Sequence, residues 1–270
     1  MTKKTKKKAV HKKSTSRKAK DAEPMLVNHD VVQTIEPLAK SLRLYHRHEV
    51  KGLDAIPKKG KAIIAVNHSL ATYDIALLVQ AIYQETGRLV RPLIDRLFYK
   101  IPYLGDLMNA VGCSAGNKAN AQKLLDDRQL LLVAPGGMRE ALKPHYEKYQ
   151  IKWITRKGFI RTAIETQTPI ILAICPMADD LYKVYPWAVT KWMYKYLKIP
   201  IFIATGVGPT PIPRPVKLIH YLSKPIKPPR MTSDPEKLEA QIDRFHKKVL
   251  THLEDLMQVA MEKNLLTEKK

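Results

Sequence analysis

The sequence predicts an α/β protein in which a mostly parallel sheet is flanked by helices and followed by a long C-terminal amphipathic helix. Across residues 61–175, short apolar runs alternate with helical segments, and this alternation is typical of strand–helix–strand units around a parallel sheet. The runs at 62–66, 130–134 and 170–174 are apolar throughout, as strands buried on both faces are. From residue 235 to 265, apolar residues recur every three or four positions, which predicts a helix with one buried face.

Composition narrows the class of partner. The chain has 270 residues, 45% of them hydrophobic, and a formal net charge of +22. Such a chain is long enough for a substantial core, and its charge predicts an anionic partner: nucleic acid, a phospholipid surface or a phosphate-bearing substrate. Its two cysteines, Cys113 and Cys175, form no CxxC pair and indicate a reducing compartment.

The chain is expected to be cytoplasmic and to associate peripherally with a membrane. No apolar run approaches the roughly 20 residues that a membrane span needs, and the N-terminus has no apolar signal-peptide region. Residues 1–24 are expected to form a disordered basic tail, because the first 20 contain ten Lys or Arg and no acid. The tail has three interpretations: an electrostatic membrane tether contributing about 1 kcal/mol per basic residue, a nucleic-acid-binding arm, or a solubilising extension.

The first ordered segments lead to the central strand. Residues 25–47 are assigned to an N-terminal amphipathic helix, with its apolar positions between 31 and 45; packing on the body is expected, and contact with a membrane interface is the alternative. A short strand at 49–53 and a turn precede the central strand, 62–66. The helix predicted at 72–86 ends at Gly87, as a helix C-terminus should.

The next segments continue the alternation. A strand is predicted at 89–94, an interrupted helical segment at 97–110, a short strand near Val111 and a helix at 119–127. The segment 97–110 carries an apolar and aromatic stripe, for which core packing is expected and an acyl-chain groove is the alternative. The stripe consists of Phe98, Tyr99, Tyr103, Leu104, Leu107 and Met108.

The C-terminal part completes the domain organisation. After a helix at 157–166, aromatic residues and lysines are interleaved at 182–197, which favours a helix at a lipid interface or a lid over a substrate; a basic helix on the rim of the core is the alternative. Late strands are predicted at 201–206 and 216–222. We assign residues 48–230 to one domain and 231–270 to the C-terminal helix.

The candidate site follows the central strand. Asn67 and His68 end it, and Asp74 stands at the start of the next helix, where α/β sheets place reactive groups. A neutral imidazole can take a proton from a substrate hydroxyl if a carboxylate fixes its other nitrogen. Since there is no GxSxG motif, no covalent enzyme intermediate is indicated. On pattern alone, His68 is equally well explained as a catalytic residue or as a turn histidine.

The histidine pair His46 and His48 and the glycine pair Gly136 and Gly137 are weaker indications of a functional site. His46 and His48 are not accompanied by an HExxH or CxxC pattern, so no metal site is predicted. Gly136 and Gly137 follow the buried strand at 130–134, where glycines allow a close backbone approach or a positive φ. Such a pair is found both in ligand loops and in plain tight turns.

Four blocks in order resemble those of the phospholipid/glycerol acyltransferase superfamily. They are Asn67-His68 with Asp74, residues 112–118, Pro135-Gly-Gly-Met-Arg-Glu140 and Pro169-Ile-Ile. The most specific stretch, residues 135–159, is similar to the branch of neutral-lipid mono- and diacylglycerol acyltransferases and phytyl-ester-synthase-like proteins. The resemblance spans about residues 48–228.

This resemblance implies an O-acyltransferase with a glycerolipid acyltransferase-like fold. His68 would be the general base, and Asp74 would orient it. The acceptor would be a lipid alcohol, and the acyl donor would be acyl-CoA or acyl carrier protein, with no further cofactor. An anionic membrane surface is the expected partner. The tetrahedral oxyanion needs preorganised donors, and the substrate-binding residues implied are Asn67, Lys118, Gly136, Gly137, Arg139 and Glu140.

Two departures from the family pattern concern the site. Five residues, not the usual four, separate His68 from Asp74, which fits the neutral-lipid branch. Lys118 stands where arginine is usual and supplies no planar fork for phosphate. One alternative is a lysophospholipid or lysophosphatidate acyltransferase. The other is a non-enzymatic scaffold that binds nucleic acid or lipid. The sequence contains no nucleic-acid recognition motif to support a nucleic-acid-binding scaffold.

Overall fold

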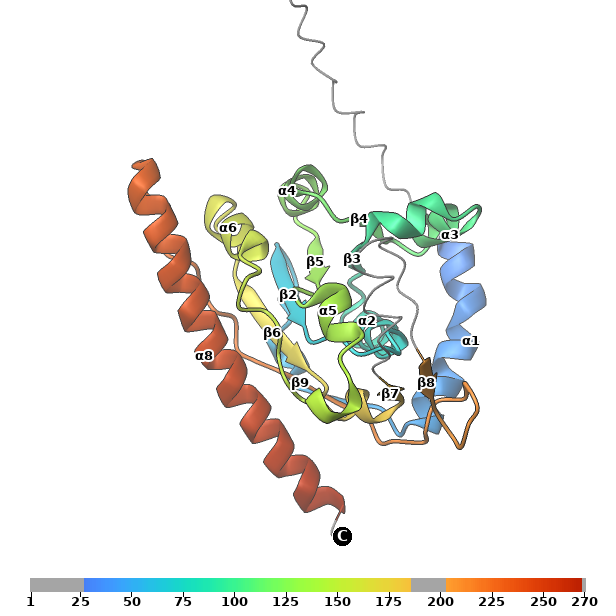
Figure 1. Ribbon diagram of the computed structural model, residues 1–270. Helices are drawn as coiled ribbons and strands as arrows, with labels where there is room; N and C mark the ends of the chain where they lie inside the picture. The colour runs from blue at the N-terminus through green and yellow to red at the C-terminus, as the bar shows by residue number, and fades with distance from the viewer. Residues whose placement is uncertain (1–26, 186–202, 269–270) are drawn as a thin grey trace, which may run out of the picture.

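A seven-stranded sheet forms the centre of the computed structural model, which describes residues 27–185 and 203–268 (Figure 1). The strand order is β1-β9-β6-β2-β5-β3-β4. All neighbouring pairs are parallel except β6 and β9, so the predicted mostly parallel sheet is confirmed. The strands are β1 (Glu49–Lys51), β2 (Ala62–Val66), β3 (Val90–Ile94), β4 (Ser114–Ala115), β5 (Leu130–Val133), β6 (Ile170–Ile174) and β9 (Ile219–Leu222).

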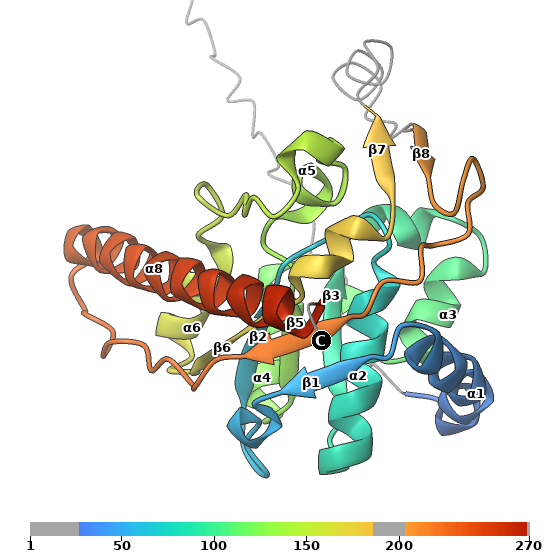
Figure 2. The same cartoon turned by 90° about the horizontal axis from the view of Figure 1, so that it is seen from below.

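The helices cover both faces of this sheet, as Figures 1 and 2 show. The α-helices are α1 (His29–Tyr45), α2 (Tyr73–Thr86), α3 (Leu104–Ala110), α4 (Lys118–Asp126), α5 (Gly137–Ala141), α6 (Gly158–Glu165) and α8 (Pro235–Glu268). Short 3-10 helices are η1 (Leu53–Ala55), η2 (Arg96–Lys100), η3 (His145–Glu147) and η4 (Pro176–Asp180). A separate antiparallel pair consists of β7 (Lys183–Tyr185) and β8 (Ile203–Thr205).

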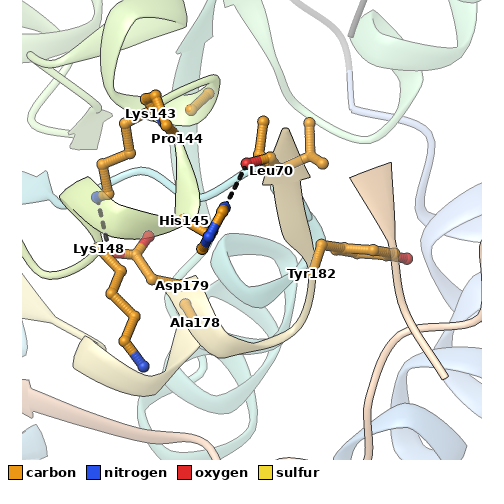
Figure 3. A pocket seen from close by; sticks show the side chains of 10 residues that line it. Leu70, Lys143, Pro144, His145, Lys148, Ala178, Asp179 and Tyr182 are labelled. Atoms are coloured by element: carbon orange, nitrogen blue, oxygen red, sulfur yellow. Dashed lines mark hydrogen bonds and ion pairs between the residues drawn. The ribbon is translucent and has the colours of Figure 1, made fainter. Parts of the chain in front are cut away.

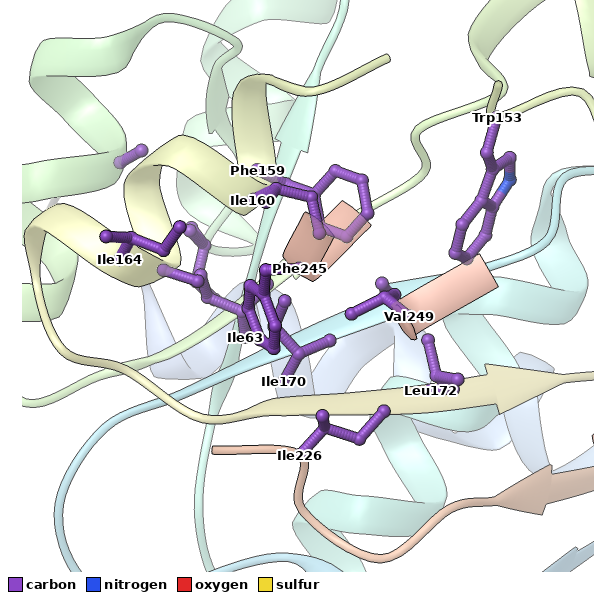
Figure 4. Packing of buried hydrophobic residues seen from close by; sticks show 14 of the residues in the cluster. Ile63, Trp153, Phe159, Ile160, Ile164, Ile170, Leu172, Ile226, Phe245 and Val249 are labelled. Carbon is purple, nitrogen blue, oxygen red and sulfur yellow. The ribbon is translucent and has the colours of Figure 1, made fainter. Parts of the chain in front are cut away.

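Alternation along the central strands divides the core into two layers. Ile63 and Ala65 of β2 pack with α4, α6 and α8, whereas Ile64 and Val66 pack with α2. This follows from the two-residue period of a strand, which turns successive side chains to opposite faces. The first layer holds the buried indole of Trp153 and one face of α8 (Figure 4). The predicted C-terminal helix is thus part of the core.

Two predictions in the middle of the chain are wrong. There is no strand near Val111, because its N–H donates to Leu107 O and closes the last turn of α3; the strand begins at Ser114. The aromatic stripe at 97–110 does not pack in the core. Tyr103 is 88% exposed, and Phe98 and Leu107 are also exposed.

Helix α1 packs on the body through only part of its surface. Arg43 donates to Gln84 of α2 at 2.6 Å, and Asn28 N–H donates to Ala110 O at 2.9 Å. The apolar side chains Leu38 and Leu44 remain 64% and 80% exposed. The expected packing of this helix on the body is confirmed at Leu42, which packs against the buried cluster around Leu77, whereas Ile35 and Leu38 of the apolar stripe remain exposed.

Two further expectations concern membranes. Among the described residues, no helix combines the length and the apolar character needed to cross a bilayer. Most of the aromatic and lysine-rich segment at 182–197, and all of the basic tail at 1–24, lie outside the described residues.

Candidate active site

His68 stands at the sheet edge where β2, β5 and β6 end together. The register places Val66 beside Ala173 and Ala65 beside Val133, so the carboxyl ends of these strands meet. The backbone N–H of His68 donates to Glu140 Oε1 at 2.8 Å. This hydrogen bond fixes the turn that carries the imidazole.

Glu140 ties three segments together from α5. Its side chain is 0% exposed, and while Oε1 accepts from His68, Oε2 accepts from Lys152 N–H at 3.2 Å. Burial raises its pKa, against the nearby Lys143 charge and these two hydrogen bonds. With both oxygens taken by backbone amides, Glu140 is placed to position His68, whereas the sequence predicts contact with substrate.

Gly136 and Gly137 of this loop are glycines for two different structural reasons. A Cβ at Gly136 would lie 1.8 Å from Glu140 Oε2, so a side chain there would displace the buried carboxylate. Gly137 has φ +51°, which glycine adopts readily. Its N–H donates to Ala134 O at 3.1 Å, so this amide is already engaged in the turn.

Asn67 fastens the end of β2 to the end of β6. It is buried, its Oδ1 accepts from Cys175 N–H at 2.8 Å, and its amide donates to Cys175 O at 3.2 Å. The predicted substrate-binding residue therefore has both amide groups occupied by backbone, and it sets the position of the neighbouring His68.

The imidazole of His68 is held neutral. Its Nδ1 is buried and has no hydrogen-bond partner. Burial lowers the pKa of His68 to about 4, and the charge of Lys143 acts in the same direction. At neutral pH the ring therefore carries one proton and offers one unprotonated nitrogen, as a general base must.

Asp74 lies in the first turn of α2 and is fully buried. Ser69 donates to its Oδ1 at 3.2 Å, while Oδ2 has no hydrogen-bond partner. Burial raises the pKa of Asp74 to about 7, with Asp179 as a smaller cause in the same direction. Since neither oxygen is hydrogen-bonded to His68, the orienting role of Asp74 stays a prediction.

A buried ion pair lies beside this turn, and the sequence did not point to it. Lys143 Nζ is 2.7 Å from Asp179 Oδ2, and both side chains are buried. They approach each other from the segment after α5 and from η4, in a small pocket that Leu70 also lines (Figure 3). Burial raises the pKa of Asp179. The only feature of the sequence that could have pointed to this ion pair is the position of Lys143, three residues after Glu140. Nothing in the sequence connects Lys143 with Asp179.

Two predicted binding residues lie on the surface. Lys118 is exposed at the start of α4 and forms an ion pair with Glu165 of α6 at 2.7 Å. Arg139 is exposed on α5. The structure thus brings together Asn67, His68, Asp74, Gly136, Gly137 and Glu140 at one sheet edge, while Lys118 belongs to a helix–helix contact.

About 70% of the chain is similar in sequence to known proteins. A family model described as Acyltransferase matches residues 47–175. Proteins called "DGAT1/2-independent enzyme synthesizing storage lipids" from Bos taurus and Homo sapiens are each 30% identical over 193 residues, covering 71% of this chain and 56% and 57% of their own lengths. An uncharacterized protein of Mycobacterium tuberculosis is 25% identical over 70% of this chain and 53% of its own.

The chain spans just over half the length of these relatives. Among solved structures, the crystal structure of the 1-acyl-sn-glycerophosphate acyltransferase PlsC from Thermotoga maritima matches with a TM-score of 0.45 and 17% identity. That match covers 82% of this chain and 79% of PlsC.

Proposed function

Since the chain belongs to the glycerolipid acyltransferase superfamily, we propose that it transfers a fatty acyl group from an acyl thioester to a lipid hydroxyl. The observation that carries this proposal is the neutral imidazole of His68. The buried Glu140 carboxylate accepts the backbone N–H of His68 and fixes the turn that carries this ring, and burial lowers the pKa of the imidazole to about 4.

In the proposed reaction, the acceptor alcohol attacks the thioester carbonyl while His68 takes the hydroxyl proton. The C–O bond forms, the carbonyl becomes a tetrahedral oxyanion, and the C–S bond then breaks. The leaving thiolate receives the proton from the imidazolium. No covalent bond to the enzyme forms, and the ester and the free thiol are the products.

The oxyanion requires donors placed before the reaction. Because the Gly137 amide already bonds Ala134 O, we assign this role to the Gly136 amide and the exposed Arg139. Lys143 also lies near His68, but its charge is balanced by the ion pair with Asp179, so we assign it no role at the oxyanion. Coenzyme A and acyl carrier protein are both suitable thiol carriers for this chemistry.

We propose a neutral lipid alcohol, such as a glyceride hydroxyl, as the acceptor. Lys118, where the family pattern expects a phosphate-binding arginine, is ion-paired with Glu165 on the surface. The relatives named for storage-lipid synthesis support the same class of acceptor.

The decisive experiment uses the full chain with labelled acyl-CoA or acyl carrier protein and a mixture of mono- and diacylglycerol and lysophosphatidate. We expect an ester product, identified by mass, and a loss of at least about 100-fold in turnover for His68→Ala, since general-base catalysis contributes about 10²–10⁴-fold. The exposed His252→Ala is the matched control and should retain activity. Undiminished turnover of a folded His68→Ala protein would contradict the mechanism.

We further propose that the protein works on a membrane surface. Exposed apolar side chains on α1 and on η2–α3 support this, with the exposed basic residues Arg47 just after α1 and Lys100 at the end of η2. Helices α1 and α3 are in contact and lie on the side of the molecule opposite α8 (Figure 1). An apolar surface accompanied by basic residues suits an anionic bilayer.

A further inference from the structure

A chain of three buried side chains ends at Asp74. His220 of β9 connects Asp74 of α2 with His48, the residue before β1. His220 Nδ1 is 2.9 Å from His48 Nε2, and His220 Nε2 is 4.0 Å from Asp74 Oδ2. All three side chains are shielded from solvent. Neither histidine belongs to the sequence motif that contains His68 and Asp74.

The strand directions bring His220 to this position. Since β9 runs antiparallel to β6, Tyr221 pairs with Ile174, and the start of β9 lies at the edge where β2 and β6 end. On the other side of β9, Val50 of β1 pairs with His220. His48, two residues earlier than Val50, therefore faces the same side of the sheet.

Protonation follows from burial. Burial lowers the pKa of His48 to about 4 and that of His220 well below 6.5, so both rings are neutral at pH 7. A neutral imidazole has one N–H donor and one acceptor nitrogen. In the His48–His220 hydrogen bond, one ring must donate and the other must accept.

Only one of the two arrangements suits the surroundings. If His48 Nε2–H donates, the proton of His220 is on Nε2 and faces Asp74 Oδ2. If His220 donates instead, its Nε2 lone pair faces the carboxylate, and the proton of His48 moves to Nδ1, which is buried without a partner. His48 Nδ1 has no partner in either arrangement, so the difference lies at Asp74: an Nε2–H that faces the carboxylate is attracted to it, whereas a lone pair that faces it is repelled. The first arrangement is therefore favoured.

We propose that His220, held in one tautomer by His48, is a positioning residue that directs its Nε2–H at Asp74 and keeps this carboxylate ionised and oriented for His68. This inference rests on the proposed acyl transfer for its effect on turnover, but not for its effect on Asp74. The N–H dipole favours the anion, so removing it must raise the proton affinity of Asp74.

The direction of the pH dependence follows from this. Burial already raises the pKa of Asp74 to about 7, and ionised Asp74 accepts a stronger hydrogen bond from imidazole than the protonated acid does. Activity should fall as pH decreases through the pKa of Asp74, and loss of His220 should move this fall to higher pH. The other titratable or charged groups around the chain are Arg43, His46, Glu49, Tyr73, Cys175 and Asp179.

The test is a carboxyl ¹³C NMR titration of the full-length protein labelled at aspartate, with the Asp74 signal assigned through Asp74→Asn. In His220→Leu we expect the midpoint of Asp74 to rise by about one pH unit, a tenfold change in proton affinity. In His220→Gln, whose amide N–H replaces the Nε2 donor, it should stay near the wild-type value. The acid limb of kcat/KM should move in the same way.

Two further variants keep the test decisive. His48→Leu leaves His220 in place but removes its tautomeric constraint, so it should raise the midpoint even if His220→Leu does not fold. His246→Leu removes a buried histidine from the opposite core layer and should leave the midpoint unchanged. An unmoved midpoint in His220→Leu or His48→Leu, or an equal shift in His220→Gln, would overturn the proposal.

The titration does not depend on catalysis. If the wild-type protein transferred no acyl group to any acceptor, the proposed function would fail, while the Asp74 midpoints would still decide the role of His220. If turnover were present but its acid limb did not move with the midpoint, Asp74 would not be coupled to His68 as proposed.

Discussion

The polar side chains at the sheet edge mainly form hydrogen bonds with backbone groups. Asn67 and Glu140 together accept three backbone N–H groups, from Cys175, His68 and Lys152. Buried polar groups are stable only when they are hydrogen-bonded in this way. Such contacts hold the His68 turn in one geometry before a substrate arrives, which is the condition for efficient proton transfer.

Glu140→Gln tests this positioning. The amide has one acceptor oxygen, so its NH₂ group would face a backbone N–H that Glu140 now satisfies. We expect the free energy of unfolding to fall by about 1–3 kcal/mol, the cost of an unsatisfied buried polar group, together with reduced turnover. Urea denaturation and the acyl-transfer assay measure the two effects.

The exposed Glu254→Gln on α8 is the control and should change stability by less than about 0.5 kcal/mol. Unchanged stability and turnover in Glu140→Gln would mean that the His68 turn does not depend on this carboxylate.

The periodicity of the sequence predicts where the helices and strands lie, but not which distant segments they contact. The buried strands β2, β5 and β6 and the helices α2, α4, α6 and α8 follow directly from apolar runs and helical spacing. The antiparallel direction of β9 and the short α5 carry no such signal, because they depend on contacts between distant segments. For the same reason the sequence pointed to Asn67 and Glu140 as notable residues, but not to their backbone partners.

Helix α8 offers a direct test of how an element contributes to the core. Leu253 is 0% exposed in the layer shared with α6 and β6. Leu253→Ala should lower the free energy of unfolding by about 2–5 kcal/mol through lost burial and a cavity. Val259→Ala, at an exposed position of the same helix, should change it by less than about 0.5 kcal/mol.

Chemical denaturation of the full chain measures both changes. If Leu253→Ala were as mild as Val259→Ala, α8 would not be packed on the sheet as described. A small effect would also mean that residues 231–270 behave as an independent segment.

For the molecule as a whole, charge and apolar exposure bear on the membrane binding that we propose. The formal charge is +22, of which the first 20 residues carry ten positive charges. Electrostatic attraction draws such a chain to an anionic surface, and the exposed side chains of α1 and α3 add an apolar contribution. The two contributions are separable, because salt screens only the first.

A double variant tests the apolar contribution. Leu38→Glu with Tyr103→Glu should weaken binding to phosphatidylserine-containing vesicles at least tenfold, because two exposed apolar side chains are replaced by anions. Vesicle co-sedimentation at low and at high salt measures the binding. Val259→Glu changes an exposed residue of α8, the helix on the side of the molecule opposite α1 and α3, and should bind within about twofold of the wild type. The double variant adds two negative charges and Val259→Glu adds one, so an equal loss per added charge in the two proteins would show that only net charge matters.

The reversed direction of β9 has a practical consequence for anyone shortening the chain. The segment that matches the acyltransferase family ends at residue 175, yet the edge of β6 is completed by β9, residues 219–222, and one core layer is closed by α8. A fragment ending at 175 would leave an apolar strand edge unpaired, and such edges promote aggregation. The smallest fragment that folds on its own should therefore extend through α8.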